Sequence, residues 1–313
     1  MQYSIRKWNQ NIEDMKAIIH VYKKTYPQLP VYEPKEFLVM LSKRMEGFED
    51  GLSVAECDDT IIGFANLFPE ENPTKIRLLG GVSPMFQRHG VGSALLQHSI
   101  ALSQKRGYTE MQSMSFTSNP NGETFLKSAG FVDRDRIFWN RRDCNMPPPL
   151  WARQKYESVI AAGIRIMTGT EFEQLRPDWD RCWWEHVMES LKDIPSDTPF
   201  EVMPFEKWKS YLEKPFCDRS RAFIAVDRTS IAGILQLSIP VDREININHT
   251  SVNRAYRRRG ISTALKFAAI QSLQTEDLHW LRTQNHQRNP MHLLNQSFGF
   301  TNIDTQIEWA KEL

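Results

Sequence analysis

The sequence predicts an α/β protein made of two tandem domains of one fold, each a mixed, mostly antiparallel sheet flanked by helices. Three observations predict this class. A glycine-containing loop between an apolar strand and a helix occurs twice, about 170 residues apart. In each half, polar turns separate short runs rich in β-branched and aromatic residues, which are typical of strands. A run of prolines lies between the halves.

The duplication is visible in the register of the two loops. The first loop and its helix occupy residues 82–95, and the second occupy residues 252–265. The same offset aligns residues 61–64 with residues 231–234 upstream, and each copy ends with a Gly-Phe pair, displaced by one residue. A shared offset over that length does not arise by chance, so the chain contains a duplicated domain.

Each half begins with a short strand and an amphipathic helical stretch, and it continues with a strand hairpin closed by a polar turn. A further strand leads into the repeated loop and helix, and another strand, a helix and a final strand complete the domain. The predicted opening strands and hairpins are residues 4–7, 52–56 and 60–67 in the first half and residues 163–167, 222–226 and 231–237 in the second.

Prolines mark the join between the halves. Pro147, Pro148 and Pro149 cannot continue a helix or a central strand, because proline lacks an N–H donor and fixes its backbone angle. The next stretch, residues 150–162, has helical spacing and ends before Gly163, so we predict a bridging helix. The expected domains are residues 1–145 and 163–313, joined by a proline-rich linker and bridging helix at residues 146–162.

Composition restricts the partner and the compartment. The chain has 313 residues, of which 41% are hydrophobic and 25% charged, and this is ordinary usage for a globular protein of two domains. The formal net charge of +1 argues against a nucleic acid or a membrane as partner. The four cysteines lack metal-ligand spacing and no signal peptide is evident. We therefore expect a cytoplasmic monomer or homodimer with no metal.

The repeated loop has the chemistry of an anion site. Its pattern is Gln/Arg-x-x-Gly-x-Gly/Ser at the start of a helix. Glycine allows a tight turn and a close approach, and the free N–H groups at the helix start face an anion with the helix dipole behind them. The first copy has Gly90 and Gly92, whereas the second has Gly260 and Ser262, whose side chain stands where a ligand should lie close. The sequence therefore predicts two phosphate-binding loops.

These motifs resemble those of the GNAT N-acetyltransferase superfamily in its tandem-repeat form. The resemblance implies two GNAT-like domains whose loops bind the pyrophosphate of acetyl-coenzyme A. A later family motif, matched from Thr283 to Phe300, is expected to pack beside the pantetheine arm. The cofactor-binding residues that the resemblance implies are Val82, Gln87, Arg88, His89, Gly90, Val91, Gly92 and Ser93 in the first half, and Val252, Arg257, Arg258, Arg259, Gly260, Ile261, Ser262, Asn285 and Asn289 in the second.

Acetyl transfer to an amine requires a base, because a lysine-like amine has a pKa of about 10.4 and is protonated at neutral pH. The strand before the second loop offers Glu244 or His249. Strict alternation places Glu244, Asn246, Asn248 and Thr250 on one face as a polar row. The corresponding strand of the first half has no carboxylate or histidine.

The resemblance also implies an acid that protonates the departing thiolate. Family members often place a Tyr four residues before the Gly of the Gly-Phe pair, and this chain has Leu126 and Asn295 there. The identity of the acid is therefore open. We count Asn295, together with Glu244 and His249, among the candidate catalytic residues.

The resemblance implies an acetyltransferase that moves an acetyl group from acetyl-coenzyme A to a small-molecule or peptide amine. Because the C-terminal half has the fuller motif, we expect catalysis there, and we expect the N-terminal half to bind cofactor with reduced or lost activity. Two alternatives are open. The protein is a coenzyme A sensor or structural protein without catalysis, or the first copy alone is active, because Gly92 matches the motif better than Ser262.

Overall fold

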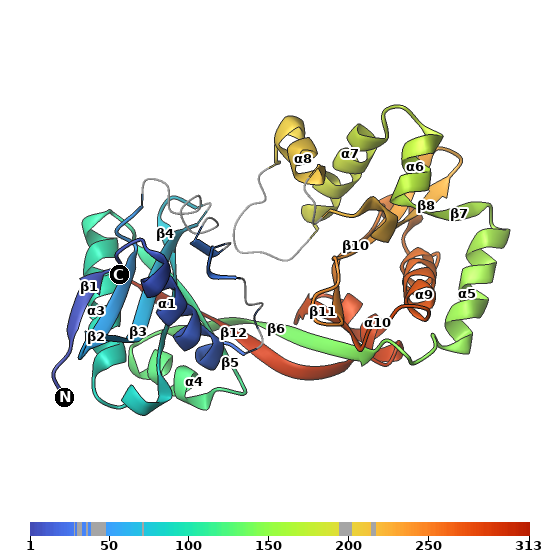
Figure 1. Cartoon of the computed structure of the whole chain (residues 1–313). Helices are drawn as coiled ribbons and strands as arrows, with labels where there is room; N and C mark the ends of the chain where they lie inside the picture. The colour runs from blue at the N-terminus through green and yellow to red at the C-terminus, as the bar shows by residue number, and fades with distance from the viewer. Residues whose placement is uncertain are drawn as a thin grey trace. The chain divides into compact units, whose positions relative to one another are not determined.

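The chain divides into two compact units, each of which contains six strands. The computed structural model describes residues 1–27, 29, 33–35, 37–38, 48–70, 72–193, 202–213 and 217–313. Unit 1 comprises Met1–Arg136 and Thr305–Leu313, and unit 2 comprises Ile137–Asp304. Both are mixed α/β units, so the predicted fold class is confirmed (Figure 1).

The sheet of unit 1 has the strand order β1-β2-β3-β4-β5-β12. Its neighbours run antiparallel except β4 and β5, which are parallel. The elements are β1 (Ser4–Lys7), α1 (Ile12–Thr25), β2 (Leu52–Cys57), β3 (Thr60–Pro69), β4 (Lys75–Val82), η1 (Pro84–Phe86), α3 (Val91–Lys105), β5 (Glu110–Phe116), α4 (Pro120–Ser128) and the end of β12 (Thr301–Glu312).

Unit 2 repeats this arrangement with the order β6-β11-β10-β9-β8-β7, in which only β10 and β11 are parallel. The elements are the end of β6 (Val132–Asp143), α5 (Leu150–Ala161), β7 (Ile164–Thr168), α6 (Gly169–Leu175), α7 (Trp179–Leu191), α8 (Phe205–Leu212), η2 (Arg219–Arg221), β8 (Ala222–Asp227), β9 (Ser230–Leu237), β10 (Glu244–Val252), η3 (Arg254–Tyr256), α9 (Ile261–Leu273), β11 (Trp280–His286) and α10 (Met291–Ser297).

The last strand of each sequence half completes the sheet of the other unit. Residues 137–143 of β6 pair with β11, and residues 306–312 of β12 pair with β5. This division differs from the expected domains, 1–145 and 163–313, which assign each of these strands to the opposite unit. The difference has a physical reason, because alternation along a strand identifies its buried face but not the strand beside it.

The two faces of each sheet are covered by different helices. In unit 1, α3 buries Val91 and Leu95 against the sheet, and α1 lies against β3 and β4 on the other face. In unit 2, α9 is buried in the same way. The predicted bridging helix is α5, and it packs beside α9 as part of unit 2, with the rings of Tyr156 and Phe267 5.0 Å apart (Figure 1).

Candidate active site

The two parallel strands of each sheet separate after a short paired stretch. Residues 75–77 of β4 pair with residues 110–112 of β5, and residues 244–246 of β10 pair with residues 280–282 of β11. In unit 1 the N–H of Ser83 donates to Ile62 on β3, so alternation turns the N–H groups of Gly80 and Val82 toward the gap. Each sheet therefore has a gap lined by backbone donors.

The predicted anion loop lies at the mouth of this gap in unit 1. Arg88 and Gly90 have left-handed φ angles of 66° and 84°, and this backbone conformation forms the turn that leads into α3. The first helix bond joins the N–H of Ala94 to the carbonyl of Gly90, at 3.0 Å. The N–H groups of Val91, Gly92 and Ser93 precede it and have no partner within the helix. We call these groups the unit 1 nest.

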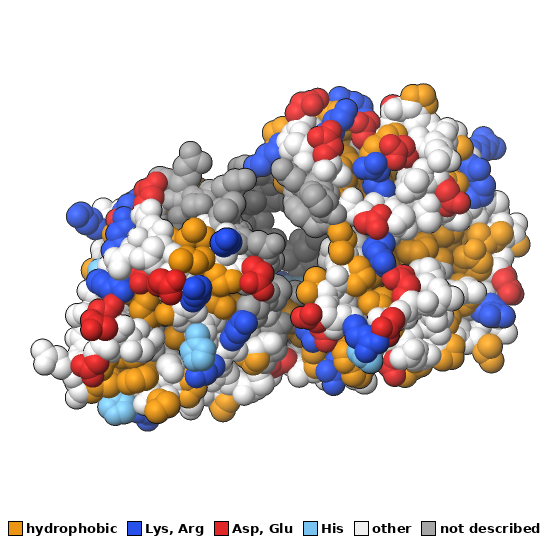
Figure 2. All heavy atoms as spheres, in the orientation of Figure 1, with side chains coloured by type: hydrophobic (Ala, Val, Ile, Leu, Met, Phe, Trp, Pro, Cys, Tyr) orange, Lys and Arg blue, Asp and Glu red, His pale blue; other side chains and the backbone are white. Residues whose placement is uncertain are grey.

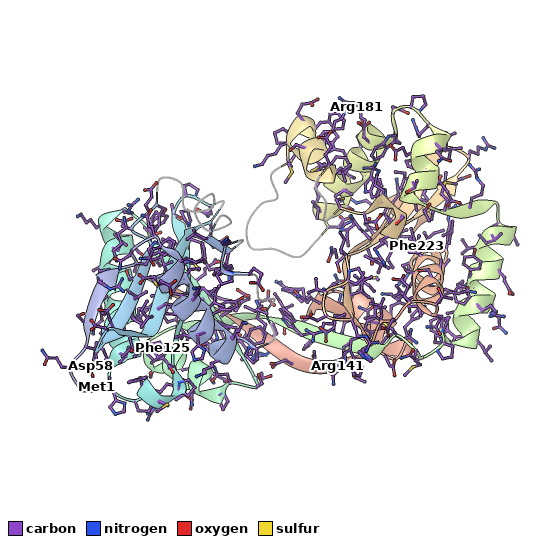
Figure 3. The ribbon with its side chains drawn as sticks, in the orientation of Figure 1. Met1, Asp58, Phe125, Arg141, Arg181 and Phe223 are labelled. Carbon is purple, nitrogen blue, oxygen red and sulfur yellow. The ribbon has the colours of Figure 1, made fainter. Side chains whose placement is uncertain are left out.

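A cleft of about 420 Å³ joins the unit 1 nest to the gap. Predicted residues on its wall are Val82, Gln87, Arg88, Gly90, Gly92 and Ser93. Phe125 of α4, labelled in Figure 3, lines it as well. The side chain of Val91 instead lies in the core, and the ring of exposed His89 contacts the carbonyl of Gln87.

Tyr26, which sequence reasoning did not identify, also lines this cleft. Its hydroxyl donates to the carbonyl of Gly80 at 2.7 Å, and burial raises its pKa to about 12, so it stays protonated. Thr25 lies so close to Gly81 that a β-carbon there would clash with its hydroxyl. No motif in the sequence marks either residue, because both lie at the end of α1, far from the loop in sequence.

The loop of unit 2 repeats the backbone geometry of unit 1. Arg258 and Gly260 have φ angles of 63° and 88°, and the N–H of Ala264 donates to Gly260 at 3.0 Å. The guanidinium of Arg257 donates from Nε to the carbonyl of Val252 at 3.2 Å, as the amide of Gln87 does to Val82 at 3.1 Å. The N–H groups of residues 261–263 therefore form a second nest, the unit 2 nest.

Side chains crowd the unit 2 nest more than its counterpart. The stem of Lys155 occupies the space beside Gly260, where an added β-carbon would clash with its Cδ. Asp193 forms ion pairs with Arg254 and Arg257. These pairs are largely exposed, and exposed ion pairs contribute little to stability, so they are readily exchanged. The remaining predicted loop residues are buried Ile261, half-buried Ser262 and exposed Arg259, whose guanidinium lies 5.3 Å from the Tyr256 ring centroid.

The asparagines of the later motif have separate roles. Asn295 is 1% exposed, and its amide donates to the side-chain oxygen of Asn285 at 2.6 Å. The side-chain oxygen of Asn295 is buried without a partner among the described residues. Asn289 instead accepts from the N–H of Met291 at 3.0 Å, at the start of α10. Only Asn285 and Asn295 therefore come together.

The structure separates Glu244 from His249. Glu244 lies where β10 and β11 are still paired, and its carboxylate forms an ion pair with Arg282 at 2.7 Å. The register between β10 and β9 shifts between Ile247 and His249, and this bulge interrupts the predicted polar row. Because of the shift, Glu244 and Thr250 point to opposite faces, whereas His249 and Ser251 share one face.

A chain of hydrogen bonds joins His249 to α7. Nε2 of His249 and Nε2 of His186 each lie 2.9 Å from the hydroxyl of Ser251. Nε2 of His249 also lies 3.3 Å from the hydroxyl of Ser190. Burial lowers the pKa of both histidines to about 4, and for His186 the neighbouring His249 adds to the effect. Both rings are therefore neutral at pH 7.

A second cavity, of about 470 Å³, lies beside this chain in unit 2. His186 and Ser190 line it together with residues of the loop, including Arg254 and Arg257. Sequence patterns do not mark His186 as a ligand, because a lone histidine on a helix carries no spacing signal. Among the described residues, no group of three or more His, Cys, Asp or Glu side chains could hold a metal ion, and no helix has the length and apolarity to cross a bilayer.

Comparison with known proteins agrees with this geometry. An acetyltransferase (GNAT) domain model matches residues 49–133, and an acetyltransferase (GNAT) family model matches residues 176–300. The GCN5-related N-acetyltransferase of Sphaerobacter thermophilus is similar in fold, with 18% identity, a TM-score of 0.71 and coverage of 99% of this chain and 95% of that one. No curated protein sequence gives a significant match.

A tandem GNAT protein from the clavulanic acid biosynthesis pathway is also similar in fold. It shares 16% identity with a TM-score of 0.68, and the match covers 99% of this chain and 98% of that one. Both units contain the separated parallel strands and the helix-start nest, and both sequence halves match a GNAT model. The chain therefore belongs to the GNAT acetyltransferase family and carries two GNAT domains.

Proposed function

We propose that this protein is an N-acetyltransferase that moves the acetyl group of acetyl-coenzyme A to the amine of a small molecule or peptide, with transfer in unit 2. The observation that carries the proposal is the nest that opens onto a gap between parallel strands, present in both units. The N–H groups of the nest would bind the pyrophosphate, and N–H groups of the strand would bind the thioester carbonyl. The family model matches support acetyl transfer in general.

The difference between the two gaps supports transfer in unit 2. Three residues before Val252, unit 2 has His249, and three residues before Val82, unit 1 has Leu79. His249 is a neutral imidazole at neutral pH, because burial lowers its pKa to about 4, and it can accept a proton. It is a better candidate for the base than Glu244, whose carboxylate is held by Arg282 at the paired end of the strands.

Asn295 supports the departing thiolate in this proposal. Its amide is an N–H donor that does not release a proton, so it stabilises negative charge by hydrogen bonding and cannot replace an acid. The bond to Asn285, at 2.6 Å, fixes the orientation of the amide. The proton that the thiolate needs must therefore come from another group.

The cleft of unit 1 favours a different role for this unit, the binding of coenzyme without catalysis. Its cleft of about 420 Å³ reaches the nest, yet no histidine or carboxylate stands among the described residues on its wall. We propose that coenzyme bound in unit 1 is retained rather than consumed, as the sensor alternative requires. Unit 1 then contributes binding, and unit 2 contributes turnover.

Composition and surface charge support a small partner. The net charge is +1, and Figure 2 shows basic and acidic side chains interspersed on the visible face of both units. We therefore propose an amine substrate rather than a nucleic acid or a membrane. All four cysteines are free thiols, which suits a reducing cytoplasm.

Two glycine substitutions with matched controls test this division. Gly90→Asp and Gly260→Asp each introduce an acidic side chain into a nest at left-handed φ angles of 84° and 88°. Gly107→Asp and Gly163→Asp carry the same backbone strain, at 84° and 87°, where an added β-carbon meets nothing within 4 Å. The controls therefore reproduce the backbone strain of the nest variants without an acidic side chain in a nest.

Titration with coenzyme A and thiol release from acetyl-coenzyme A over an amine panel provide the measurements. We expect two binding sites in the parent, loss of one site with turnover retained in Gly90→Asp, and loss of turnover in Gly260→Asp. The control variants should keep both properties. Loss of turnover in Gly90→Asp alone would show that catalysis occurs in unit 1. Binding of coenzyme A without thiol release for any amine would show that the protein is a sensor rather than an enzyme.

A further inference from the structure

The hydrogen bond donated by the hydroxyl of Ser190 implies a direction for the hydrogen bonds around Ser251. The hydroxyl hydrogen of Ser190 goes to the carbonyl of Val187 at 2.8 Å, so the oxygen of Ser190 only accepts from Nε2 of His249. Nε2 of His249 therefore carries a hydrogen, which it shares with the hydroxyl oxygen of Ser251 at 2.9 Å. Ser251 must then donate its own hydrogen to Nε2 of His186.

This direction assigns a tautomer to each ring. In this assignment His249 is protonated on Nε2 and has its lone pair on Nδ1. His186 has its lone pair on Nε2 and its hydrogen on Nδ1. His186 lines the cavity of about 470 Å³, whereas His249 follows the bulge in β10, where β10 has already separated from β11.

We propose that His249, Ser251 and His186 form a proton relay that connects the amine-binding side of unit 2 to the second cavity. The inference rests on the proposed transfer in unit 2 and adds the route by which the amine loses its proton. Ser251 and His186 are positioning residues in this scheme, because they act through His249. The matched positions of unit 1 hold no such chain, since Leu79 and Gly81 replace His249 and Ser251.

Every proton that enters the relay also leaves it. The ammonium N–H bond breaks as Nδ1 of His249 gains the proton, and Nε2 of His249 releases its hydrogen to Ser251. Ser251 passes its original hydrogen to Nε2 of His186, and Nδ1 of His186 releases a proton to solvent in the cavity. The reverse passage delivers one proton through His249 to the coenzyme thiolate and restores both tautomers. The second N–H proton of the ammonium leaves to water as the amide forms.

A relay fits the chemistry of these histidines better than a stationary base. Burial lowers the pKa of His249 to about 4, so the ring does not hold a second proton at neutral pH. An ammonium with a pKa of about 10.4 would transfer its proton to such a ring only at a cost of several kcal/mol. Handing the proton on as it arrives avoids a long-lived imidazolium, and the hydroxyl of Ser251 connects the two rings at 2.9 Å on each side.

Charged groups of both signs line the second cavity, where the proposed relay releases its proton. Those of α7 and its end are Glu185, Glu189 and Asp193, and those of the neighbouring loops are Arg176, Arg254 and Arg257. Arg254 and Arg257 pair with Asp193, and Arg176 pairs with Asp178. At the other end of α7, Lys209 of α8 pairs with Asp180. Strand β9 contributes no charged side chain over Ser230–Leu237.

The first test determines the histidine tautomers by NMR and does not depend on enzyme activity. Long-range proton–nitrogen correlation spectra of histidine-labelled protein distinguish a protonated Nδ1 from a protonated Nε2. We expect His249 to be protonated on Nε2 and His186 on Nδ1, with His249 shifting toward a mixture in Ser251→Ala. The opposite assignment for either ring in the parent would overturn the relay.

The second test uses a pair of serine variants. Ser251→Ala removes the bridging hydroxyl, whereas Ser251→Thr keeps it on a residue that strands accept readily. We expect Ser251→Ala to lower kcat at pH 7 by about 10²-fold with little change in KM for acetyl-coenzyme A, and Ser251→Thr to retain most of the rate. The Ala defect should shrink at high pH, where the amine deprotonates without help.

His249→Gln and Gly260→Asp together separate failure of the relay from failure of the proposed function. If His249→Gln leaves kcat unchanged while Gly260→Asp abolishes turnover, transfer occurs in unit 2 without His249 and the relay is wrong. If Gly260→Asp also leaves turnover unchanged, transfer does not occur in unit 2 and the proposed function fails. If His249→Gln is defective while Ser251→Ala matches the parent at every pH, unit 2 is catalytic and the relay is wrong. An equal loss in Ser251→Ala and Ser251→Thr that does not vary with pH would also overturn the relay, because that pattern reports packing.

Discussion

At the scale of single residues, Glu244 and His249 show how position decides chemical role. Both are titratable residues of one strand, yet Glu244 has Arg282 as a partner at 2.7 Å where the strands are paired. His249 stands past the bulge, where the strands have separated. The sequence identified both as candidates from residue type alone. It did not distinguish them, because a bulge and an ion pair across strands are set by neighbours that are distant in sequence.

This contrast predicts opposite outcomes for two substitutions. Glu244→Gln removes an ion pair, so we expect a loss of stability of about 1 kcal/mol and turnover within a few-fold of the parent. His249→Gln removes the proton acceptor, so we expect kcat to fall by 10² or more, an order-of-magnitude estimate for loss of a base. Both are measured by thiol release and urea unfolding. A large Glu244→Gln defect that fades at high pH would identify Glu244 as the base.

At the scale of elements, local patterns predicted most strands and helices. The expected helix at residues 150–162 is α5, Leu150–Ala161, and the expected hairpins are β2 with β3 and β8 with β9. Those elements form from nearby residues, and so their turns and apolar spacing mark them. The contact between α7 and β10 through Ser251 was not predictable, because it joins residues about 65 positions apart and depends on one bulge.

The α7–β10 contact makes stability depend on pH. Burial lowers the pKa of His186 and His249 from 6.5 to about 4, so the fold favours neutral rings. Their contribution is complete above pH 6.5 and is lost as the pH falls toward 4, by on the order of 3 kcal/mol for one such group. We expect the free energy of unfolding in urea to fall across this range. The double variant His186→Gln, His249→Gln should lose less over the same range, and an equal loss would place the dependence in other groups.

At the scale of the whole molecule, the duplicated halves are not the units that fold. Each unit takes its sixth strand from the other half of the sequence, β12 in unit 1 and β6 in unit 2. In unit 1, Trp309 of β12 is 2% exposed and its indole N–H donates to Ser115 of β5 at 2.9 Å. Repeat boundaries read from the sequence group each of these two strands with its own half, whereas each strand pairs with a strand of the other half.

This exchange predicts which fragments fold. A fragment of residues 1–145 lacks β12, so β5 becomes an exposed edge and the buried surface around Trp309 is lost, which costs several kcal/mol by analogy with large core truncations. A fragment of residues 1–136 joined by a flexible Gly/Ser linker to residues 305–313 contains all of unit 1. We expect the linked fragment to unfold cooperatively in urea and to bind coenzyme A, and the fragment 1–145 to aggregate or remain unfolded. Trp309→Ala in the linked fragment tests whether β12 stabilises unit 1 mainly through this side chain. If it does, the variant should lose most of the stability that β12 adds to the linked fragment. Cooperative folding of residues 1–145 alone would show instead that β6 can pair with β5 in the absence of β12, and that the exchange is one of two available arrangements.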